Sequence, residues 1–310
     1  MEIKVGVVGV GHLGMHHARI YSEMPGVKLV GVVDNDKDRV EMIANTLNVP
    51  YFTDLESFIA ATSPDAINIV VPTKNHYEVA VKAMNHGIHI LVEKPVTTTL
   101  QEAEELLRLV KEKKLILQVG HIERFNSAIT HLTNFLEEPY FIRSQRIGPF
   151  SARIADVGVV LDLMIHDVDI ILSIIKSKVK SISAVGRSII SNHEDIASLQ
   201  LLFENGAIAE ILVSRVSEKR CRQMEIMDKS SFVTVNYETQ DIIIQNCKKD
   251  SAGSMLEISE HPLFLKTEPL KLELQHFISS IRNGSQPLVG IEDGKRALEI
   301  CIDALHQINP

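Results

Sequence analysis

The sequence of 310 residues has no tryptophan and only three cysteines. Cys221, Cys247 and Cys301 are far apart and form no C-x-x-C pair, which argues against a disulfide scaffold or zinc ribbon and favours a reducing compartment. Long apolar runs are also missing, because four ionisable side chains interrupt the most apolar helical stretch, residues 159–175. The first residues lead directly into a strand-like run without an export signal. We therefore expect a cytoplasmic protein with no membrane partner.

Positive charge is scarce as well. The chain has 32 lysines and arginines against 40 acidic residues, for a formal net charge of -8. This balance argues against nucleic acid as a partner. Hydrophobic residues make up 45% and charged residues 23% of the chain, which excludes a disordered or low-complexity protein. The length predicts about two domains.

Residues 1–119 show the alternation of strands and helices that is typical of an α/β fold. Apolar β-branched runs alternate with segments of helical period, which predicts a doubly wound parallel sheet of the Rossmann type. We expect strands at residues 3–8, 27–33, 51–52, 66–71, 88–92 and 115–119. We expect helices at residues 15–24, 37–47, 55–61, 76–85 and 100–113. Thr99 and Glu102 predict a capping box at the start of the last of these helices.

Residues 120–310 have a different rhythm, in which strand-like runs follow one another. This pattern predicts an α+β domain with an open, largely antiparallel sheet. Strands are expected at residues 141–147, 179–187, 197–203, 207–213, 221–227, 231–237 and 241–245. Two helices, at residues 271–283 and 292–307, close the chain, and residues 248–266 are expected to form a loop.

The first predicted strand runs into the fingerprint Gly9-x-Gly11-x-x-Gly14, which opens the first helix. The glycines permit a tight turn, close approach of a pyrophosphate and close helix packing, and His12 and Leu13 lie within the same turn. Twenty residues after Gly14, Asp34 ends the second strand, where a carboxylate accepts hydrogen bonds from ribose and repels a 2'-phosphate. The fingerprint therefore predicts binding of NAD rather than NADP.

Two further loops follow the fourth and fifth strands and should reach the same edge of the sheet. Their predicted cofactor-binding residues are Pro72, Thr73, Asn75 and His76 in the first loop, and Glu93 and Lys94 in the second. An ammonium group at Lys94 can bind a sugar hydroxyl and stabilise an alkoxide. No metal site is predicted: His12, His16 and His17 have metal-like helical spacing but lie where the cofactor anion should bind, and the acids at 34, 36 and 38 lack the rest of a calcium loop.

The helix predicted over residues 159–175 carries Asp162, His166 and Asp169 on one stripe. Ionisable groups on an apolar helix must face a wet cleft or one another. A histidine can take the proton of a secondary alcohol while a nicotinamide takes the hydride, and a carboxylate can orient that histidine. We expect Asp162 and His166 to be catalytic, or else His166 is a hydrogen-bonded structural residue.

A basic patch precedes this helix. Arg143, Arg146 and Arg153 can bind an anionic substrate such as a nucleotide sugar, since guanidinium groups suit phosphate and carboxylate. The alternative is a set of scattered, solvated arginines. Arg124 and Asn126, just after the domain junction, are further candidates for substrate contacts.

These motifs, in this order, resemble the glucose-fructose oxidoreductase / inositol dehydrogenase (Gfo/Idh/MocA) family across essentially the whole chain. The motifs are the glycine fingerprint, Pro72-Thr-x-x-His76, Glu93-Lys94-Pro95 and Asp162-x-x-x-His166. The resemblance implies a Rossmann domain followed by an open sheet that mediates assembly into a homodimer or homotetramer. It also implies that the lysine, the aspartate and the later histidine line the substrate site. Many members have glycines ahead of the aspartate, and this chain departs from that pattern, which bears on the substrate class.

Within the family, residues 120–126, 148–153 and 156–160 look like members that oxidise the 3-hydroxyl of UDP-N-acetylglucosamine, a step toward the amino sugars of lipid A. This resemblance implies that His166 deprotonates the hydroxyl, Lys94 holds the same oxygen, and Arg153 meets the UDP phosphates. By their chemistry, either Lys94 or His166 can be the base. The alternatives are an NAD-dependent dehydrogenase of a free sugar or inositol, an NAD-dependent glycosidase, and a non-enzymatic NAD-binding regulator.

Overall fold

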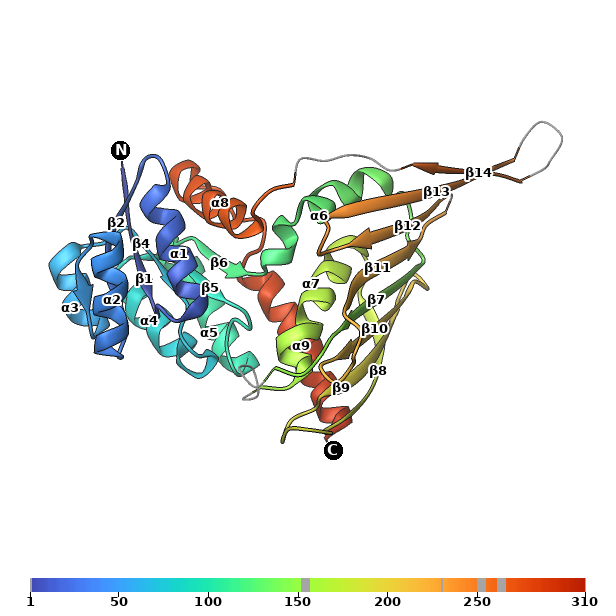
Figure 1. Cartoon of the computed structure of the whole chain (residues 1–310), viewed down its shortest axis with the longest axis horizontal. Coiled ribbons are helices and arrows are strands. Elements are labelled where there is room, and N and C mark those ends of the chain that lie inside the picture. Colours follow the sequence, from blue (N-terminus) through green and yellow to red (C-terminus); the bar gives the residue numbers. More distant parts are fainter. Residues whose placement is uncertain (1, 152–156, 230, 250–254, 261–265, 310) are drawn as a thin grey trace. The chain divides into compact units, whose positions relative to one another are not determined.

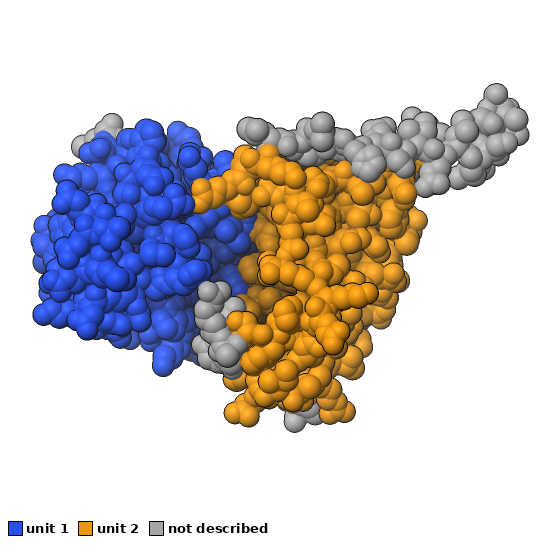
Figure 2. Space-filling model, viewed as in Figure 1, with its two compact units in different colours: residues 1–122, 270–295 blue, residues 123–269, 296–310 orange. Residues whose placement is uncertain are grey.

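The computed structural model describes residues 2–151, 157–229, 231–249, 255–260 and 266–309. The chain divides into two compact units: unit 1 comprises residues 1–122 and 270–295, and unit 2 comprises residues 123–269 and 296–310 (Figure 2). The sequence predicts one domain over residues 120–310. The structure differs from that prediction, because residues 270–295 return to the N-terminal unit.

Unit 1 is built on a six-stranded parallel sheet with the strand order β3-β2-β1-β4-β5-β6 (Figure 1). The strands are β1 (Ile3–Val8), β2 (Val27–Val33), β3 (Tyr51–Phe52), β4 (Ala66–Ile69), β5 (His89–Glu93) and β6 (Leu117–Gly120). The connections are α1 (His12–Glu23), α2 (Lys37–Leu47), α3 (Leu55–Thr62), the 3-10 helix η1 (Thr73–Asn75), α4 (His76–Asn85) and α5 (Leu100–Lys113). The strand order is that of a dinucleotide-binding doubly wound fold, and the predicted Rossmann class is confirmed.

A helix from the far end of the sequence completes the core of unit 1. Helix α8 (Pro269–Asn283) buries Leu270, Leu274 and Phe277 in the same apolar cluster as Ile20 and Tyr21 of α1. Positions four and three apart lie on one stripe of a helix, so these residues give α8 a single apolar face. The partner for this face lies 250 residues earlier in the chain, which explains why the sequence alone does not assign α8 to unit 1.

Unit 2 contains an eight-stranded sheet with the order β14-β13-β12-β11-β7-β10-β9-β8 (Figure 1). The strands are β7 (Phe141–Ile147), β8 (Val179–Arg187), β9 (Ile196–Phe203), β10 (Ile208–Ser214), β11 (Cys221–Met227), β12 (Ser231–Asn236), β13 (Asp241–Lys249) and β14 (Met255–Glu260). The helical segments are η2 (Ile122–Phe125), α6 (Ser127–Leu132), η3 (Thr133–Phe135), the π-helix η5 (Val160–Met164), α7 (Ile165–Ile174) and α9 (Ile291–Ile308). The first residue of η2 and the start of α9, up to residue 295, belong to unit 1. Neighbouring strands are antiparallel except β7 and β10, which confirms the predicted largely antiparallel sheet.

The two faces of this sheet differ. In β7, Ile142, Ser144 and Arg146 are buried, whereas the alternate residues are exposed or half-buried. The buried positions face the apolar core formed with α6, α7 and α9, as the side-chain period of two in a strand requires. The prediction of a loop over residues 248–266 is wrong in part, because β13 runs to Lys249 and β14 pairs with it.

Among the described residues, every helix is too short or too polar to cross a bilayer.

Candidate functional site

The glycine turn between β1 and α1 is set by two different kinds of constraint. Gly9 has a φ of +88°, and a Cβ at Gly14 would lie 1.8 Å from the carbonyl oxygen of Gly9, so the fold itself demands both glycines. Gly11 is different, because a Cβ there would have no protein atom within 4 Å. The space beside Gly11 therefore suits a ligand that approaches the backbone at the start of α1, as a pyrophosphate does.

Asp34, at the end of β2, is held in place by the same turn. One carboxylate oxygen accepts from the amide of Val10 at 2.9 Å and the other from the amide of Asp36 at 3.0 Å. The Arg39 guanidinium lies 3.6 Å away. These contacts fix the carboxylate beside the glycine turn, and its remaining lone pairs can accept hydrogen bonds from ribose hydroxyls. The residues thus fit NAD, which when bound accepts a hydride.

His76 joins the two loops that follow β4 and β5. Its ring nitrogens lie 2.9 Å from the carbonyl oxygens of Pro95 and Val71. Burial lowers the pKa of His76, and the hydrogen bonds to these carbonyls oppose that effect. His76 therefore ties the Lys94-Pro95 segment to the neighbouring loop. Lys94 itself is half-buried at the carboxyl end of β5, while Pro72 and Asn75 are exposed and Thr73 is half-buried.

Two buried hydrogen bonds and one close contact lead from α1 to Glu93. The Tyr21 hydroxyl donates to Asn68 Oδ1 at 2.9 Å, and Asn68 Nδ2 lies 2.8 Å from His17 Nδ1. An amide nitrogen can only donate, so His17 Nδ1 accepts and the ring proton is on Nε2. That nitrogen lies 3.3 Å from Glu93 Oε1. The arrangement orients the Glu93 carboxylate directly before Lys94, and the sequence prediction did not include His17.

Glu273 of α8 adds a second carboxyl group beneath Glu93. It is fully buried, and neither of its carboxyl oxygens has a hydrogen-bond partner among the described residues. Burial, and then the charge of Glu93, raises the pKa of Glu273 well above its usual range. A Cβ at Gly120 would lie 2.9 Å from the Glu93 carboxyl, so this glycine makes room for that group. No motif in the sequence signals Glu273, because the neighbouring carboxylate, Glu93, comes from a strand that is distant in the sequence.

In unit 2, the predicted catalytic stripe begins with one turn of π-helix, η5, rather than regular α-helix. Asp162 lies in this turn and lines a cavity of 350 Å³, and His166 follows in the first turn of α7; both are half-buried. A π-turn widens the helix locally and often occurs at functional sites. The sequence predicts a continuous helix because the apolar pattern does not reveal the extra residue in the turn.

Asp167 and Asp169 of the same helix form ion pairs with arginines of unit 2. The fully buried Asp167 lies 2.9 Å from Arg146 Nε, and Ser144 donates to it at 2.8 Å. Asp169 Oδ1 lies 3.4 Å from Arg124 Nη1, and only 3% of Asp169 is exposed. These pairs hold α7 against the sheet and η2, so Asp169 does not share the half-buried setting of Asp162 and His166.

Asn126 is a helix cap. Its side-chain oxygen accepts from the amide of Ala128 at 3.1 Å, and its amide nitrogen donates to the carbonyl oxygen of Tyr237 at 2.9 Å and to Glu123 at 3.2 Å. It is 3% exposed. The contacts that the structure shows for Asn126 thus fix η2 and α6 on the sheet.

The predicted basic patch does not form as a single surface. Arg146 is buried and binds Asp167 and Glu123, whereas Arg143, three residues earlier, lies on the other face of the sheet near Glu210. Residues three apart in a strand point to opposite faces. The prediction that both arginines contribute to one anion site is therefore wrong. Arg153 lies outside the described residues.

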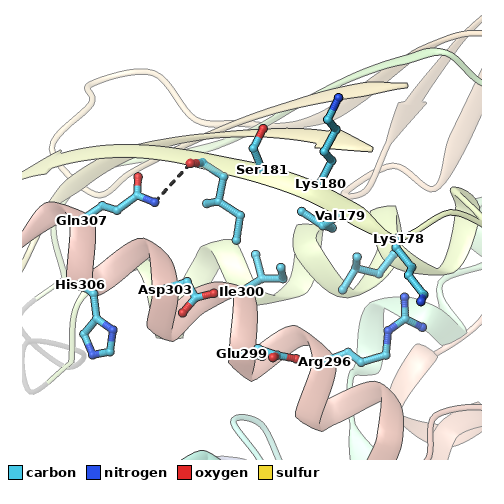
Figure 3. Close-up of a pocket in the computed structure, with 12 residues that line it drawn as sticks. Lys178, Val179, Lys180, Ser181, Arg296, Glu299, Ile300, Asp303, His306 and Gln307 are labelled. Atoms are coloured by element: carbon cyan, nitrogen blue, oxygen red, sulfur yellow. Dashed lines mark hydrogen bonds between the residues drawn. The ribbon is translucent and has the colours of Figure 1, made fainter. Parts of the chain in front are cut away.

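A separate groove of 640 Å³ lies between β8 and α9 of unit 2 (Figure 3). Lys178 and Lys180 lie on one side and Glu299 and Asp303 on the other, and Gln307 donates to a carbonyl oxygen of β8 at 3.2 Å. None of the predicted site residues lines this groove. The candidate site in unit 2 is therefore the region of Asp162 and His166.

A glycine turn with an acid at the end of β2, in a six-stranded Rossmann sheet, defines a class: dinucleotide-dependent oxidoreductases. Residues 3–121 match an oxidoreductase family with an NAD-binding Rossmann fold, and residues 118–229 match the C-terminal domain of the same family. The chain belongs to the Gfo/Idh/MocA family. It is an oxidoreductase whose cofactor is NAD.

The chain is similar to several named members. It is 31% identical to UDP-N-acetylglucosamine 3-dehydrogenase of Acidithiobacillus ferrooxidans, over 91% of this chain and 89% of the relative. A solved structure of that enzyme aligns with a TM-score of 0.92 and 30% identity, covering 99% of this chain and 98% of the other. The chain is also 31% identical to scyllo-inositol 2-dehydrogenase (NAD(+)) of Bacillus subtilis, over 98% of this chain and 93% of the relative.

Proposed function

We propose that the protein oxidises the 3-hydroxyl of UDP-N-acetylglucosamine to a ketone with NAD, a reaction that serves amino-sugar synthesis for lipid A. The observation that carries this proposal is the likeness to the Acidithiobacillus ferrooxidans enzyme, which extends over nearly the whole chain in both sequence and fold. The local structure supports it, because unit 1 carries the glycine turn and unit 2 carries half-buried Asp162 and His166.

The cofactor site in this proposal lies at the carboxyl ends of the strands of unit 1. Gly9, Gly11 and Gly14 admit the pyrophosphate to the start of α1, and Asp34 accepts hydrogen bonds from the adenosine ribose. The neighbouring residues complete the site, and they are His12, Leu13, Pro72, Thr73, Asn75, His76, Glu93 and Lys94. The support for these assignments is the steric room at Gly11 and the fixed carboxylate of Asp34.

The chemistry assigns one task to each group that contacts the substrate. His166 takes the proton of the 3-hydroxyl, Lys94 binds the same oxygen, and Asp162 orients the sugar. The alcohol loses a proton to the base and a hydride to NAD, which leaves a 3-keto sugar, NADH and one proton. Arg124 and Asn126 position this region, since the first binds Asp169 of α7 and the second caps α6. Arg153 remains a predicted contact of the UDP phosphates.

A second candidate function is oxidation of a free inositol. The observation that favours it is the similarity to the Bacillus subtilis scyllo-inositol 2-dehydrogenase, which is as high in identity as that to the nucleotide-sugar enzyme. An inositol has no phosphate groups, so it requires no anion-binding residues beside Asp162. Substrate comparison therefore separates the two candidates.

Isotope transfer tests the reaction and its position on the sugar. The protein is incubated with NAD, a carbonyl trap and UDP-N-acetylglucosamine that carries deuterium at C3 or at C4, and the mass of the reduced cofactor is measured. We expect the extra mass only from the C3 label. His166→Ala should lower kcat by about 10²- to 10⁴-fold, as loss of a general base does, while His193→Ala at an exposed position should not. Transfer from C4, or full activity without His166, contradicts the proposal.

We further propose that the face of the sheet in unit 2 opposite α7 and α9 joins copies of the chain into a dimer or tetramer. Alternate residues of β7, β9 and β10 on this face are only half-buried or exposed. Light scattering coupled to gel filtration should give two or four times 34.6 kDa. A mass of one chain at micromolar concentration contradicts this.

A further inference from the structure

The cavity lined by Asp162 has an unusual concentration of arginine. It lies at the end of β7 on the face of the sheet that carries α7, and four guanidinium groups line it: Arg146, Arg215, Arg220 and Arg222. We call this cavity the arginine pocket. The segment 148–151 forms another part of its wall.

Two of the four arginines are buried and hydrogen-bonded to other residues of unit 2. Arg146 binds Asp167 and also donates to Glu123 at 2.9 Å. Arg215 donates at 2.7 Å both to Asp195 and to the carbonyl oxygen of residue 157. Their side chains are only 3% and 8% exposed. These two residues form a rigid wall of the arginine pocket rather than adaptable ligands.

The other two arginines share one carboxylate. Arg220 pairs with Glu238, and Arg222 Nε lies 3.8 Å from the same oxygen of Glu238. Their side chains are 60% and 35% exposed, so both are accessible to a solute. Positions two apart in an extended chain point to the same side, which brings the two guanidinium groups to one surface. One carboxylate thus serves two guanidinium groups, and neither Arg220 nor Arg222 is enclosed by its ion pair.

The fold places a third guanidinium group beside Arg222, that of Arg146, which is paired with Glu123 and Asp167. Arg222 pairs in register with Arg146 across β11 and β7, and like charges opposite one another in a sheet repel. Burial, and then the charges of Arg146 and Arg220, lowers the pKa of Arg222, while the carboxylates of Glu123 and Glu238 oppose this effect. Planar guanidinium groups bind phosphate through paired hydrogen bonds, and the accessible Arg220 and Arg222 present two such groups to the cavity.

We propose that the arginine pocket is the subsite for the diphosphate of a nucleotide sugar, with Arg220 and Arg222 as its ligands. This inference rests on the proposed function. Asp162 lines the same cavity, so a diphosphate bound by the two arginines puts its sugar on the side of the candidate catalytic residues. A free polyol has no phosphate group that could bind to this subsite. The arginine pocket therefore accounts for selection of a nucleotide sugar over an inositol.

Binding of UDP tests the subsite without any turnover. Isothermal titration of the full-length protein with UDP compares the wild type with Arg220→Gln, Arg222→Gln and the control Arg108→Gln, which removes an exposed arginine of α5. We expect Kd to rise about tenfold or more for each pocket variant, about 1.4 kcal/mol per tenfold, and less than twofold for the control. Because Arg220 is mostly exposed, its variant should fold even where Arg222→Gln does not, and circular dichroism checks that each variant keeps the secondary structure of the wild type.

The outcomes separate the subsite from the proposed function. If the wild type oxidises UDP-N-acetylglucosamine and both pocket variants keep its KM and the Kd for UDP within twofold, the subsite is wrong and the function stands. If the wild type binds UDP through these arginines but oxidises a different nucleotide sugar, the subsite stands and the sugar is wrong. If the wild type neither binds UDP nor oxidises any nucleotide sugar, both are overturned.

Discussion

Replacing Glu273 with glutamine should change how the stability of the protein depends on pH. The carboxyl group is fully buried next to Glu93, and its pKa is raised in the folded state, first by burial and then by that charge. For an acid with a raised folded-state pKa, the stabilising contribution is complete below the unfolded-state pKa of about 4.3 and is lost as pH rises toward the folded-state pKa. Each pH unit between the two values costs about 1.4 kcal/mol of unfolding free energy.

Glutamine has the shape of the protonated acid and does not titrate, so the variant should escape this loss. The unfolding free energy of both proteins is measured by urea titration with circular dichroism from pH 5 to pH 8. We expect the difference, Glu273→Gln minus wild type, to increase by about 1.4 kcal/mol per pH unit until the folded-state pKa is reached. Glu104→Gln, at an exposed position of α5, serves as the control and should give a constant difference. A constant difference for Glu273→Gln as well would refute the assignment of a protonated acid beside Glu93.

Other substitutions test the remaining parts of the account. Gly11→Ala should leave the melting temperature unchanged and weaken NAD binding measured by titration, because its Cβ meets no protein atom. Gly14→Ala should unfold unit 1, because its Cβ collides with the carbonyl oxygen of Gly9. Gly120→Ala should cost about 1–3 kcal/mol in urea titrations, as overpacking does, by displacing the Glu93 carboxylate; an unchanged value would contradict this contact. Asp195→Asn should cost about 3 kcal/mol in the same assay, because it weakens a buried ion pair, and equal stability would show that this pair is unimportant.

The sequence is informative wherever one segment determines its own structure. Strands β1, β2, β7 and β11 and helices α2, α4 and α5 have the predicted limits, because a period of 2 or 3.6 and a cap are properties of neighbouring residues. The capping box of Thr99 and Glu102 is present as predicted. The fingerprint at Gly9 is predictable for the same reason, since strand, turn and helix are contiguous.

The features that the sequence does not reveal depend on contacts between distant segments. Glu273 has no local motif, and its role appears only when α8 packs on the N-terminal sheet. The single turn of π-helix at Asp162 changes the helical hydrogen-bond spacing but leaves the apolar pattern of the sequence unchanged. Arg220 and Arg222 attract no attention in the sequence, because the pairing of Arg222 with Arg146 depends on the order of strands in the second sheet.

The initial rate of NADH formation with three substrates tests the central claim most directly. Purified protein is supplied with NAD and, in separate reactions that contain a carbonyl trap, with UDP-N-acetylglucosamine, free N-acetylglucosamine or scyllo-inositol, and absorbance of the reduced nicotinamide is recorded. The account predicts NADH with UDP-N-acetylglucosamine, little or none with the other two, and loss of the signal in Lys94→Ala and His166→Ala. NADH formed from scyllo-inositol, with none from the nucleotide sugar, would contradict it.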